Sequence, residues 1–239
     1  MVAVLLAAAL LTANPTPVET SSVGKPWAGK LTKGVAVSLK GKHHCFTWNV
    51  RKKGSNFATP LMRNLMCRTS KAVARKLGGP PMVLGSISRE GGGHMFPHKS
   101  HQSGRDVDIL FYMLNPEGQP KKSKGFYKFD ANGRCTHKRC EGWTFDVARN
   151  WELVRTLVWS ARPYVQYAFV STGLKGKLLK YARAHGEHPE IIRRAKQVLL
   201  QPKSSSPHAD HFHVRIYCTK DEKKKGCTNT GKRHSWVKR

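Results

Sequence analysis

The sequence predicts an α+β fold, in which a small antiparallel sheet is flanked by helices. Several short segments carry apolar residues at every second position, as half-buried strands do. Longer segments carry apolar residues at helical spacing, and glycine or proline clusters separate the two kinds. The 239 residues can bury one sizeable core, and two full domains would be crowded. We therefore expect a single domain over 34–218 with long disulfide-tied loops.

The first half of this domain contains candidate strands and one long helix. Alternating Val35, Val37 and Leu39 predict one or two strands within 34–50. Apolar residues at helical spacing predict a helix over 59–77, which a Gly-Gly-Pro-Pro sequence ends. Further along, strands are expected over 82–87 and 107–113, followed by a polar loop over 115–143.

The second half is richer in helices. Trp151, Val154 and Leu157 would lie on one face of a helix over 146–160. Gly186 separates two further segments of helical spacing. The remaining expected elements are a strand over 164–171, helices over 174–185 and 189–200, a linker over 201–207 and a strand over 211–218.

Both ends of the chain differ from the domain between them. Residues 1–13 form an apolar run that is too short to span a bilayer and has the length of a signal-peptide core. We interpret them as a signal-peptide remnant, against the alternative of a buried N-terminal helix. Residues 14–33 are predicted to be a flexible N-terminal segment, and 219–239 a basic tail without apolar periodicity, pinned by a disulfide.

The cysteines favour an oxidising compartment, because an even count of six suits a disulfide-bonded exported protein. A second metal site within 135–140 is the alternative for one pair, but it lacks a fourth ligand. Proximity in the sequence predicts the pairs Cys135–Cys140, Cys218–Cys227 and Cys45–Cys67.

The net charge of +29 predicts polyanionic partners. Lys and Arg are spread along most of the chain, with an extra concentration in 220–239. Nucleic acid, anionic lipid and an acidic cell-wall polymer would all be attracted by such a charge. Charge alone does not choose among them.

Two short stretches, 94–101 and 208–213, hold six of the twelve histidines. Three of only fourteen acidic residues lie in or beside these stretches. Crowding imidazoles and carboxylates together contributes little to the stability of a soluble chain, whereas a divalent metal needs such nitrogen and oxygen donors. The sequence therefore predicts a zinc site, carried by the small sheet.

Strand periodicity explains how the two stretches could form one site. Asp106 and Asp108 share one face of their expected strand, and His211 and His213 share one face of theirs. A Ser-Gly pair lets the loop after His101 fold back toward Asp108. Two histidines and one carboxylate leave zinc a position for water, which is the catalytic pattern.

The remaining polar residues of the two stretches have more than one interpretation. Asp106 is either a ligand or a residue that orients a liganding imidazole. His98 is a further ligand, a substrate contact or an ordinary loop residue. His208 either caps the entrance of the last strand or shuttles protons, and in the latter role it is a candidate catalytic residue.

The motifs Ser100-His101-Gln102-Ser103-Gly104-x-Asp106-Val107-Asp108 and His211-Phe212-His213-Val214-Arg215 resemble those of the penicillin-insensitive murein endopeptidases. These zinc peptidases belong to a fold group with lysostaphin-type enzymes, D-Ala-D-Ala peptidases and hedgehog domains. The resemblance covers roughly 60–218. It implies that His101, Asp108 and His213 bind one Zn²⁺, and that His211 is the base or stabilises the transition state. It also places His98 near the metal.

The resemblance implies a hydrolase that cleaves peptidoglycan cross-links between D-Ala and meso-diaminopimelate through a metal-activated water. Its partners would be peptidoglycan and, as further candidates, other anionic wall polymers, with no specific nucleic acid and no transmembrane segment. Such an enzyme would be exported to the bacterial periplasm or secreted.

Three alternative functions stay open at this point. One is a D,D- or L,D-carboxypeptidase on the same substrate. Another is a non-catalytic zinc-containing protein that binds the cell wall or a polyanion. A basic metal-dependent nuclease would explain the charge, but the two motifs match no nuclease motif known to us.

Overall fold

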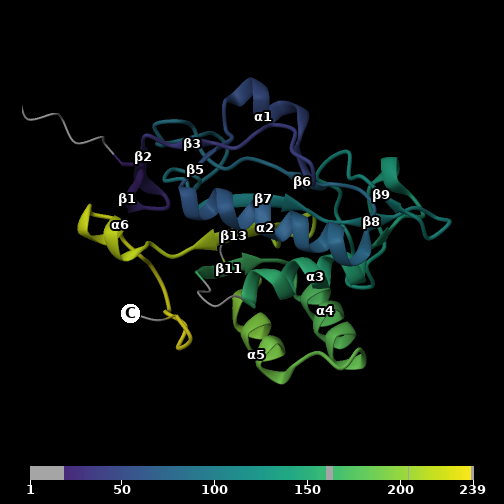
Figure 1. Cartoon of the computed structure of the whole chain (residues 1–239). Helices are drawn as coiled ribbons and strands as arrows, with labels where there is room; N and C mark the ends of the chain where they lie inside the picture. The colour runs from purple at the N-terminus through teal and green to yellow at the C-terminus, as the bar shows by residue number, and fades with distance from the viewer. Residues whose placement is uncertain (1–18, 160–163, 204, 238–239) are drawn as a thin grey trace, which may run out of the picture.

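A computed structural model describes residues 19–159, 164–203 and 205–237, and its centre is a six-stranded sheet (Figure 1). The strand order is β12 (Leu199–Leu200), β11 (Val165–Phe169), β13 (His211–Ile216), β7 (Asp106–Leu110), β6 (Met82–Leu84) and β4 (His44–Phe46). The four strands β11, β13, β7 and β6 pair antiparallel, and the edge strands β12 and β4 pair parallel to their neighbours. The α+β class and the antiparallel centre of the sheet are confirmed.

The apolar residues of α2 to α5 share one core with this sheet, and the polar residues of the central strands lie on the opposite face. The helices are α1 (Trp48–Lys53), α2 (Pro60–Leu77), α3 (Val147–Val158), α4 (Thr172–Ala184), α5 (Pro189–Val198) and α6 (Lys220–Lys224), with a 3₁₀ turn η1 (Lys138–Cys140). Figure 1 shows α2 lying along the sheet and α3, α4 and α5 forming a helical layer beside it. No helix in the described ranges is long and apolar enough to cross a membrane.

The two central strands alternate between the core and the open face. Val107 and Ile109 of β7, with Phe212 and Val214 of β13, are fully buried in the core that α2 and α3 cover. Their polar neighbours in the sequence face the other way. This alternation places every acidic and histidine side chain of the two strands on one side of the sheet.

Both long helices begin where their capping residues predict. Thr59 precedes α2, and its Oγ1 accepts a hydrogen bond from the Met62 amide. Asp146 precedes α3 and accepts from the Arg149 amide in the same way. The expected helices over 59–77 and 146–160 are therefore present, with ends shifted by a residue or two.

Short sheets occupy the regions that carry no long periodic segment. These small sheets are β1 (Ser21–Lys25) with β2 (Ala28–Thr32), β3 (Val35–Ala36) with β5 (Phe57–Ala58), and β8 (Met113–Leu114) with β9 (Pro120–Lys121) and β10 (Thr144–Phe145). The expected polar loop over 115–143 contains β9 and η1.

Two of the three expected disulfides are present, and one is not. Cys135–Cys140 and Cys218–Cys227 are bonded. The predicted Cys45–Cys67 pair is wrong, because both thiols are free. Cys67 lies on the exposed side of α2, whose other side packs on the core, whereas Cys45 is part-buried in strand β4.

The predictions for the two ends need correction where the structure describes them. Within 14–33, the segment expected to be flexible, residues 21–32 form the β1–β2 hairpin, and its Leu31 is buried. The basic tail contains α6 and a buried His234. The expected signal-peptide remnant over 1–13 lies outside the described residues.

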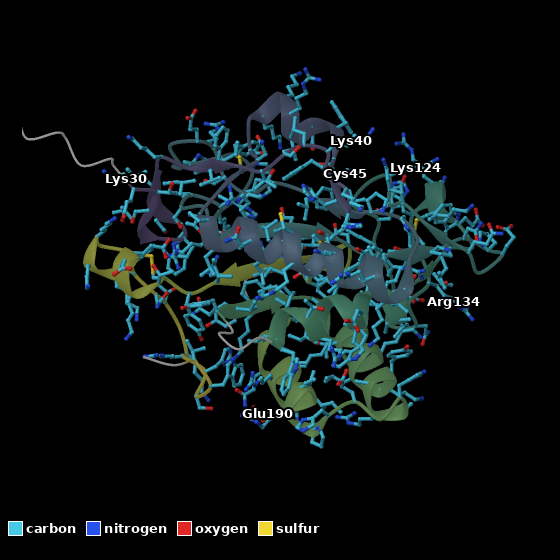
Figure 2. All side chains as sticks on the ribbon, viewed as in Figure 1. Lys30, Lys40, Cys45, Lys124, Arg134 and Glu190 are labelled. Atoms are coloured by element: carbon cyan, nitrogen blue, oxygen red, sulfur yellow. A yellow bond between two sulfur atoms is a disulfide. The ribbon has the colours of Figure 1, made fainter. Side chains whose placement is uncertain are left out.

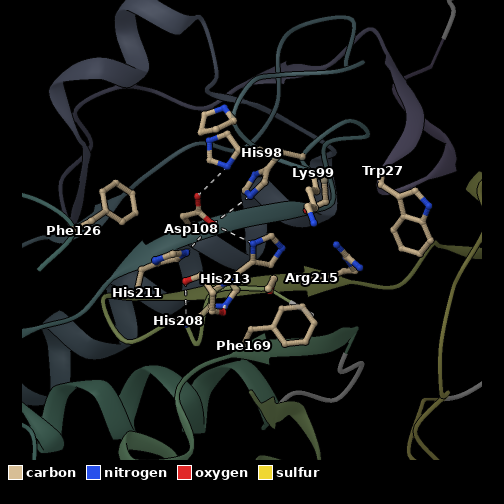
Figure 3. A pocket seen from close by; sticks show the side chains of 15 residues that line it. Trp27, His98, Lys99, Asp108, Phe126, Phe169, His208, His211, His213 and Arg215 are labelled. Atoms are coloured by element: carbon tan, nitrogen blue, oxygen red, sulfur yellow. Dashed lines mark hydrogen bonds and ion pairs between the residues drawn. The ribbon is translucent and has the colours of Figure 1, made fainter. Parts of the chain in front are cut away.

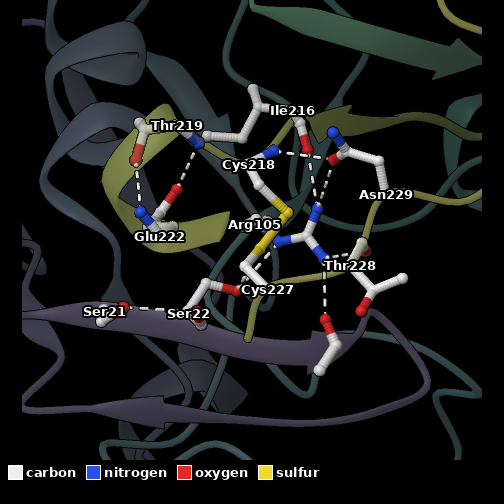
Figure 4. The surroundings of a disulfide bond; sticks show 11 residues. Ser21, Ser22, Arg105, Ile216, Cys218, Thr219, Glu222, Cys227, Thr228 and Asn229 are labelled. Atoms are coloured by element: carbon white, nitrogen blue, oxygen red, sulfur yellow. Dashed lines mark hydrogen bonds between the residues drawn. A yellow bond between two sulfur atoms is a disulfide. The ribbon is translucent and has the colours of Figure 1, made fainter. Parts of the chain in front are cut away.

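Arg105 explains how the β1–β2 hairpin and the described part of the tail are held to the domain. Its side chain is completely buried and its guanidinium donates to Ser22 Oγ at 2.9 Å, Ile216 O at 3.2 Å and Thr228 O at 3.2 Å (Figure 4). One side chain thus joins the hairpin, the end of β13 and the tail beside the Cys218–Cys227 disulfide. The hydrogen bonds of Arg105 join residues far apart in the sequence. For this reason no local sequence pattern predicts that the two terminal segments are folded.

Replacing Arg105 with methionine is expected to lower the free energy of unfolding by on the order of 3 kcal/mol, because several buried acceptors lose their donor. Urea unfolding of the oxidised protein measures the change. The exposed Arg183 on α4 provides the control substitution, Arg183→Met, with an expected change within about 0.5 kcal/mol. An Arg105→Met protein as stable as the control would show that the hairpin and tail do not depend on this side chain.

Basic side chains are spread over the molecule rather than gathered in one region. In Figure 2, labelled cations project from the N-terminal hairpin (Lys30) and from separate loops (Lys40, Lys124 and Arg134). The +29 charge is therefore a property of the surface as a whole. Such a surface attracts polyanions without selecting a sequence or a shape.

Candidate metal centre

The register of β7 and β13 brings the two predicted clusters together. In this antiparallel pair His213 lies opposite Asp108, and Arg215 lies opposite Asp106. His211 lies two residues before His213 on the same face. The loop before β7 adds His101, so four side chains from distant parts of the sequence meet at one place (Figure 3).

The carboxylate of Asp108 is the centre of this group. Its Oδ1 atom lies 3.2 Å from His101 Nε2, 3.4 Å from His211 Nε2 and 3.3 Å from His213 Nδ1. Asp108 and His101 are almost completely buried. Burial raises the pKa of the Asp108 carboxyl, but the nearby His101 and His211 outweigh it and hold that pKa well below its usual range.

Two of these atoms have no hydrogen-bond partner among the described residues. They are His101 Nε2 and Asp108 Oδ1, and both are buried. A buried polar atom without a partner costs about 1–3 kcal/mol, so such a pair needs an explanation. The nitrogen and oxygen face each other at 3.2 Å without the geometry of a hydrogen bond.

A metal ion would satisfy both atoms. Donor atoms that bind zinc tetrahedrally at about 2.0–2.1 Å lie about 3.3 Å from one another. The distances from Asp108 Oδ1 to the three imidazole nitrogens, 3.2 to 3.4 Å, agree with that spacing. Imidazole and carboxylate are also the donors that zinc prefers. The residues present therefore fit a zinc site.

The second ring nitrogen of each buried histidine is held by the protein. His101 Nδ1 hydrogen-bonds Ile87 O at 2.9 Å, and His213 Nε2 hydrogen-bonds Asp106 Oδ1 at 2.7 Å. Arg215 Nε donates to the same Asp106 oxygen at 2.7 Å. Asp106 thus contacts His213 from behind rather than joining the group around Asp108. Such contacts fix the orientation of a liganding imidazole.

His211 differs from these two histidines in its surroundings. Its Nδ1 is paired with Asp210 Oδ1 at 2.6 Å, and its side chain is 14% exposed against 1% for His101. Burial lowers the pKa of His211, but Asp108 and Asp210 outweigh it and raise that pKa to about 10. The two carboxylates therefore stabilise a positive charge on this ring once it carries a second proton.

His98 and His208 border the same group. His98 Nδ1 lies 3.9 Å from Asp108 Oδ2, and the His208 ring centre lies 4.9 Å from that of His211. Burial, together with the neighbouring histidines, lowers the pKa of each to about 4. Each is therefore a neutral imidazole at pH 7. The candidate metal-binding groups are His98, His101 and Asp108, and His208, His211 and His213.

The loop between His101 and β7 depends on Gly104. Its φ of +70° lies in the left-handed region, which favours glycine. A Cβ atom there would lie 2.9 Å from the Leu31 side chain and 3.0 Å from the Thr59 amide nitrogen. Glycine therefore lets the loop pass between the hairpin and α2, and so return His101 to Asp108.

A cleft of about 710 Å³ opens over the group. The predicted residues that line it are His98, His101, Asp108, His208, His211 and His213, whereas Asp106 is completely buried behind His213. Further lining residues that sequence reasoning did not single out as site residues are Trp27, Lys99, Phe126, Phe169 and Arg215.

Comparison with known proteins agrees with this geometry. The family model described as penicillin-insensitive murein endopeptidase matches residues 22–235. The chain belongs to this family. A curated penicillin-insensitive murein endopeptidase from Haemophilus influenzae is 29% identical over 157 residues, which is 62% of this chain and 47% of that protein. The chain thus spans about half the length of this relative.

The family match extends beyond the residues on which the resemblance is based. It begins at 22, in the β1–β2 hairpin, and ends at 235, in the tail. The hairpin supplies Trp27 to the cleft. In this member of the murein endopeptidase family, therefore, the segments on both sides of the expected domain contribute to the folded unit around the site.

Substituting Asp106 with asparagine is expected to weaken zinc affinity about 10- to 100-fold without abolishing binding. The amide keeps the shape but loses the charge that orients His213 and pairs with Arg215. Competition with a chromophoric chelator at fixed pH measures the affinity. Asp221→Asn, at an exposed position of α6, is the charge-matched control. Unchanged affinity in the Asp106→Asn protein would contradict an orienting role.

Proposed function

We propose that this chain is a zinc-dependent hydrolase of peptidoglycan that cleaves the amide cross-link between D-Ala and meso-diaminopimelate. One observation carries the proposal: three imidazoles converge on the Asp108 carboxylate inside an open cleft, in a chain of the penicillin-insensitive murein endopeptidase family. Without the family match, this geometry would indicate a metal site but would not identify the substrate.

His101, Asp108 and His213 would hold one zinc ion. Three protein ligands leave a coordination position open, and zinc there supplies an acidified water and a polarised carbonyl for hydrolysis. Burial of His101 and Asp108 supports their role as ligands, since both donor atoms otherwise lack partners among the described residues. His213 is supported by Asp106, which holds its other nitrogen.

His211 is the proposed general base. Asp210 holds its Nδ1 atom, so Nε2 is the nitrogen that can take the proton of the attacking water. The two carboxylates that flank the ring, those of Asp108 and Asp210, stabilise the imidazolium that results. His208 is a candidate to pass that proton on, because its ring lies beside that of His211 at the cleft. His98 is close enough to contact a bound substrate.

The compartment follows from the same proposal. Cross-linked peptidoglycan lies outside the bacterial cytoplasm, so the enzyme would be exported to the periplasm or secreted. Two disulfides support an oxidising compartment. The basic surface would concentrate the protein on the wall and its anionic polymers.

Digestion of purified sacculi tests the proposal. The protein is incubated with sacculi, with and without a zinc chelator, and the muropeptides are identified by mass spectrometry. We expect cross-linked dimers to become monomers, chelator to stop the reaction, and added zinc to restore it. His101→Ala should abolish the reaction and leave the protein without zinc by elemental analysis.

Other products would identify the alternatives. Loss of a terminal D-Ala, with dimers intact, would indicate a carboxypeptidase. Binding to sacculi without any change in the muropeptides would indicate a non-catalytic wall-binding protein. Dimer cleavage that survives complete zinc removal would contradict the proposed metal dependence.

A further inference from the structure

One end of the cleft is cationic and belongs to none of the roles assigned above. Arg215, Lys99 and Trp27 line it. Figure 3 shows the three on the same side of His213, away from Phe126. Arg215 follows His213 by two residues on β13 and shares its face, so its Cα lies about 7 Å further along the strand.

The Arg215 guanidinium is built into this position. The residue is only 7% exposed, and its Nε is used by Asp106. Its Cζ lies 5.8 Å from the centre of the Trp27 ring, in cation–π contact. Among the described residues, no acceptor is hydrogen-bonded to either Nη nitrogen. A nearly buried side chain thus has two donors available at the cleft.

Lys99 adds a second cation to the same end. Its side chain lines the cleft, and Figure 3 shows its amine turned toward the side on which Arg215 lies. No ion pair joins Lys99 to an acidic group of the described chain. The charge of Arg215 is balanced by Asp106, whereas that of Lys99 is not balanced by an ion pair, so this end of the cleft has a net positive charge. This end of the cleft therefore favours an anionic ligand group.

The donors match a carboxylate. The two Nη groups of a guanidinium are coplanar and bind both oxygens of a carboxylate at once. Trp27 provides an apolar wall on one side, which suits the carbon that bears the carboxylate. Arg215 Nε and His213 Nε2 each lie 2.7 Å from the same Asp106 oxygen, so the guanidinium lies close to the His213 ring and to the bond that the metal centre would cleave.

We infer that Arg215 and Lys99, with Trp27 as the wall, form a subsite for a free carboxylate next to the scissile amide. This inference rests on the proposed function. In a cross-link to meso-diaminopimelate, the carbon that carries the acylated amine also carries a free carboxylate. The subsite would select cross-links by that carboxylate and discriminate against those in which it is amidated.

A matched pair of substrates tests this inference. Two synthetic cross-linked dimers differ only in this group, which is a carboxylate in one and a carboxamide in the other. The wild-type protein should cleave the acid with a kcat/KM about 10- to 100-fold above that for the amide, as expected for hydrogen bonds to a charged group. The acid-to-amide ratio should fall toward 1 in Arg215→Gln and Lys99→Gln.

Two controls separate this effect from others. Lys180→Gln, at an exposed position of α4, removes the same charge and should keep the wild-type ratio. Zinc content is measured in every variant, because Arg215 also contacts Asp106. If Arg215→Gln lowers zinc content and both activities equally, Arg215 acts through Asp106, and its place in the subsite is overturned. No hydrogen bond or ion pair joins the Lys99 side chain to Asp106 or to the proposed ligands, so Lys99 gives an independent test.

Binding gives the same comparison without hydrolysis. Calorimetry with zinc-free protein should show about 10-fold tighter binding of the acid dimer than of the amide dimer. Cleavage of both dimers at equal rates, with equal binding, would overturn the subsite and leave the proposed function standing. Tighter binding of the acid without cleavage of either dimer by the zinc protein would overturn the proposed function and support the subsite.

Discussion

Asp108→Asn is expected to lose bound zinc and hydrolytic activity together. The Asp108 Oδ1 atom lies within 3.4 Å of a nitrogen from each of His101, His211 and His213. An asparagine has the same size but no charge, so the buried group would lose the anion at its centre. A catalytic metal typically contributes several kcal/mol to transition-state stabilisation, so under the proposed mechanism we expect kcat/KM to fall by at least about 10³-fold.

Elemental analysis and assays of one protein preparation measure both quantities. Zinc per chain and kcat/KM on a cross-linked dimer are compared with those of Glu117→Gln, which removes one charge at an exposed position. Circular dichroism establishes that the variant is folded. An Asp108→Asn protein that keeps one zinc per chain and wild-type turnover would contradict the central role of this carboxylate.

The residues around Asp108 were predictable because strand geometry is regular. A period of two places Asp106 with Asp108, and His211 with His213, whatever the rest of the fold is. The same rule places Arg215 on the face of His213, so its presence in the cleft could also have been predicted. What the period does not provide is the register that sets His213 opposite Asp108. That register depends on which apolar residues pack against α2 and α3.

Features that depend on tertiary contacts were not predictable. The β1–β2 hairpin is ordered through Arg105, which lies about eighty residues away in the chain. Its Trp27 reaches the cleft only because the hairpin is held there. The Cys45–Cys67 pairing failed for a similar reason, since closeness in sequence says nothing about which side of a helix a thiol occupies. Phe126 lies in a loop without periodicity, so no sequence signal indicated its place.

His211→Ala is expected to keep zinc and to lose turnover by about 10²- to 10⁴-fold, the usual contribution of a general base. This experiment is needed because the distances to Asp108 do not distinguish a general base from a metal ligand at His211. Its Nε2 lies 3.4 Å from Asp108 Oδ1, close to the 3.3 Å of His213. What separates them is the surroundings: His213 is backed by the buried Asp106–Arg215 pair, and His211 by the part-exposed Asp210.

Parallel measurements on three variants decide between the two roles. His211→Ala, His213→Ala and Asp210→Asn are compared for zinc content and for kcat at saturating substrate. If His211 is the general base, His211→Ala should keep zinc near one per chain and His213→Ala should lose it. Asp210→Asn should keep zinc and lose less kcat than His211→Ala. If His211→Ala loses zinc to the same extent as His213→Ala, His211 is a ligand. Proton transfer must then be assigned to another group at the cleft, for which His208 is the candidate, because its ring centre lies 4.9 Å from that of His211.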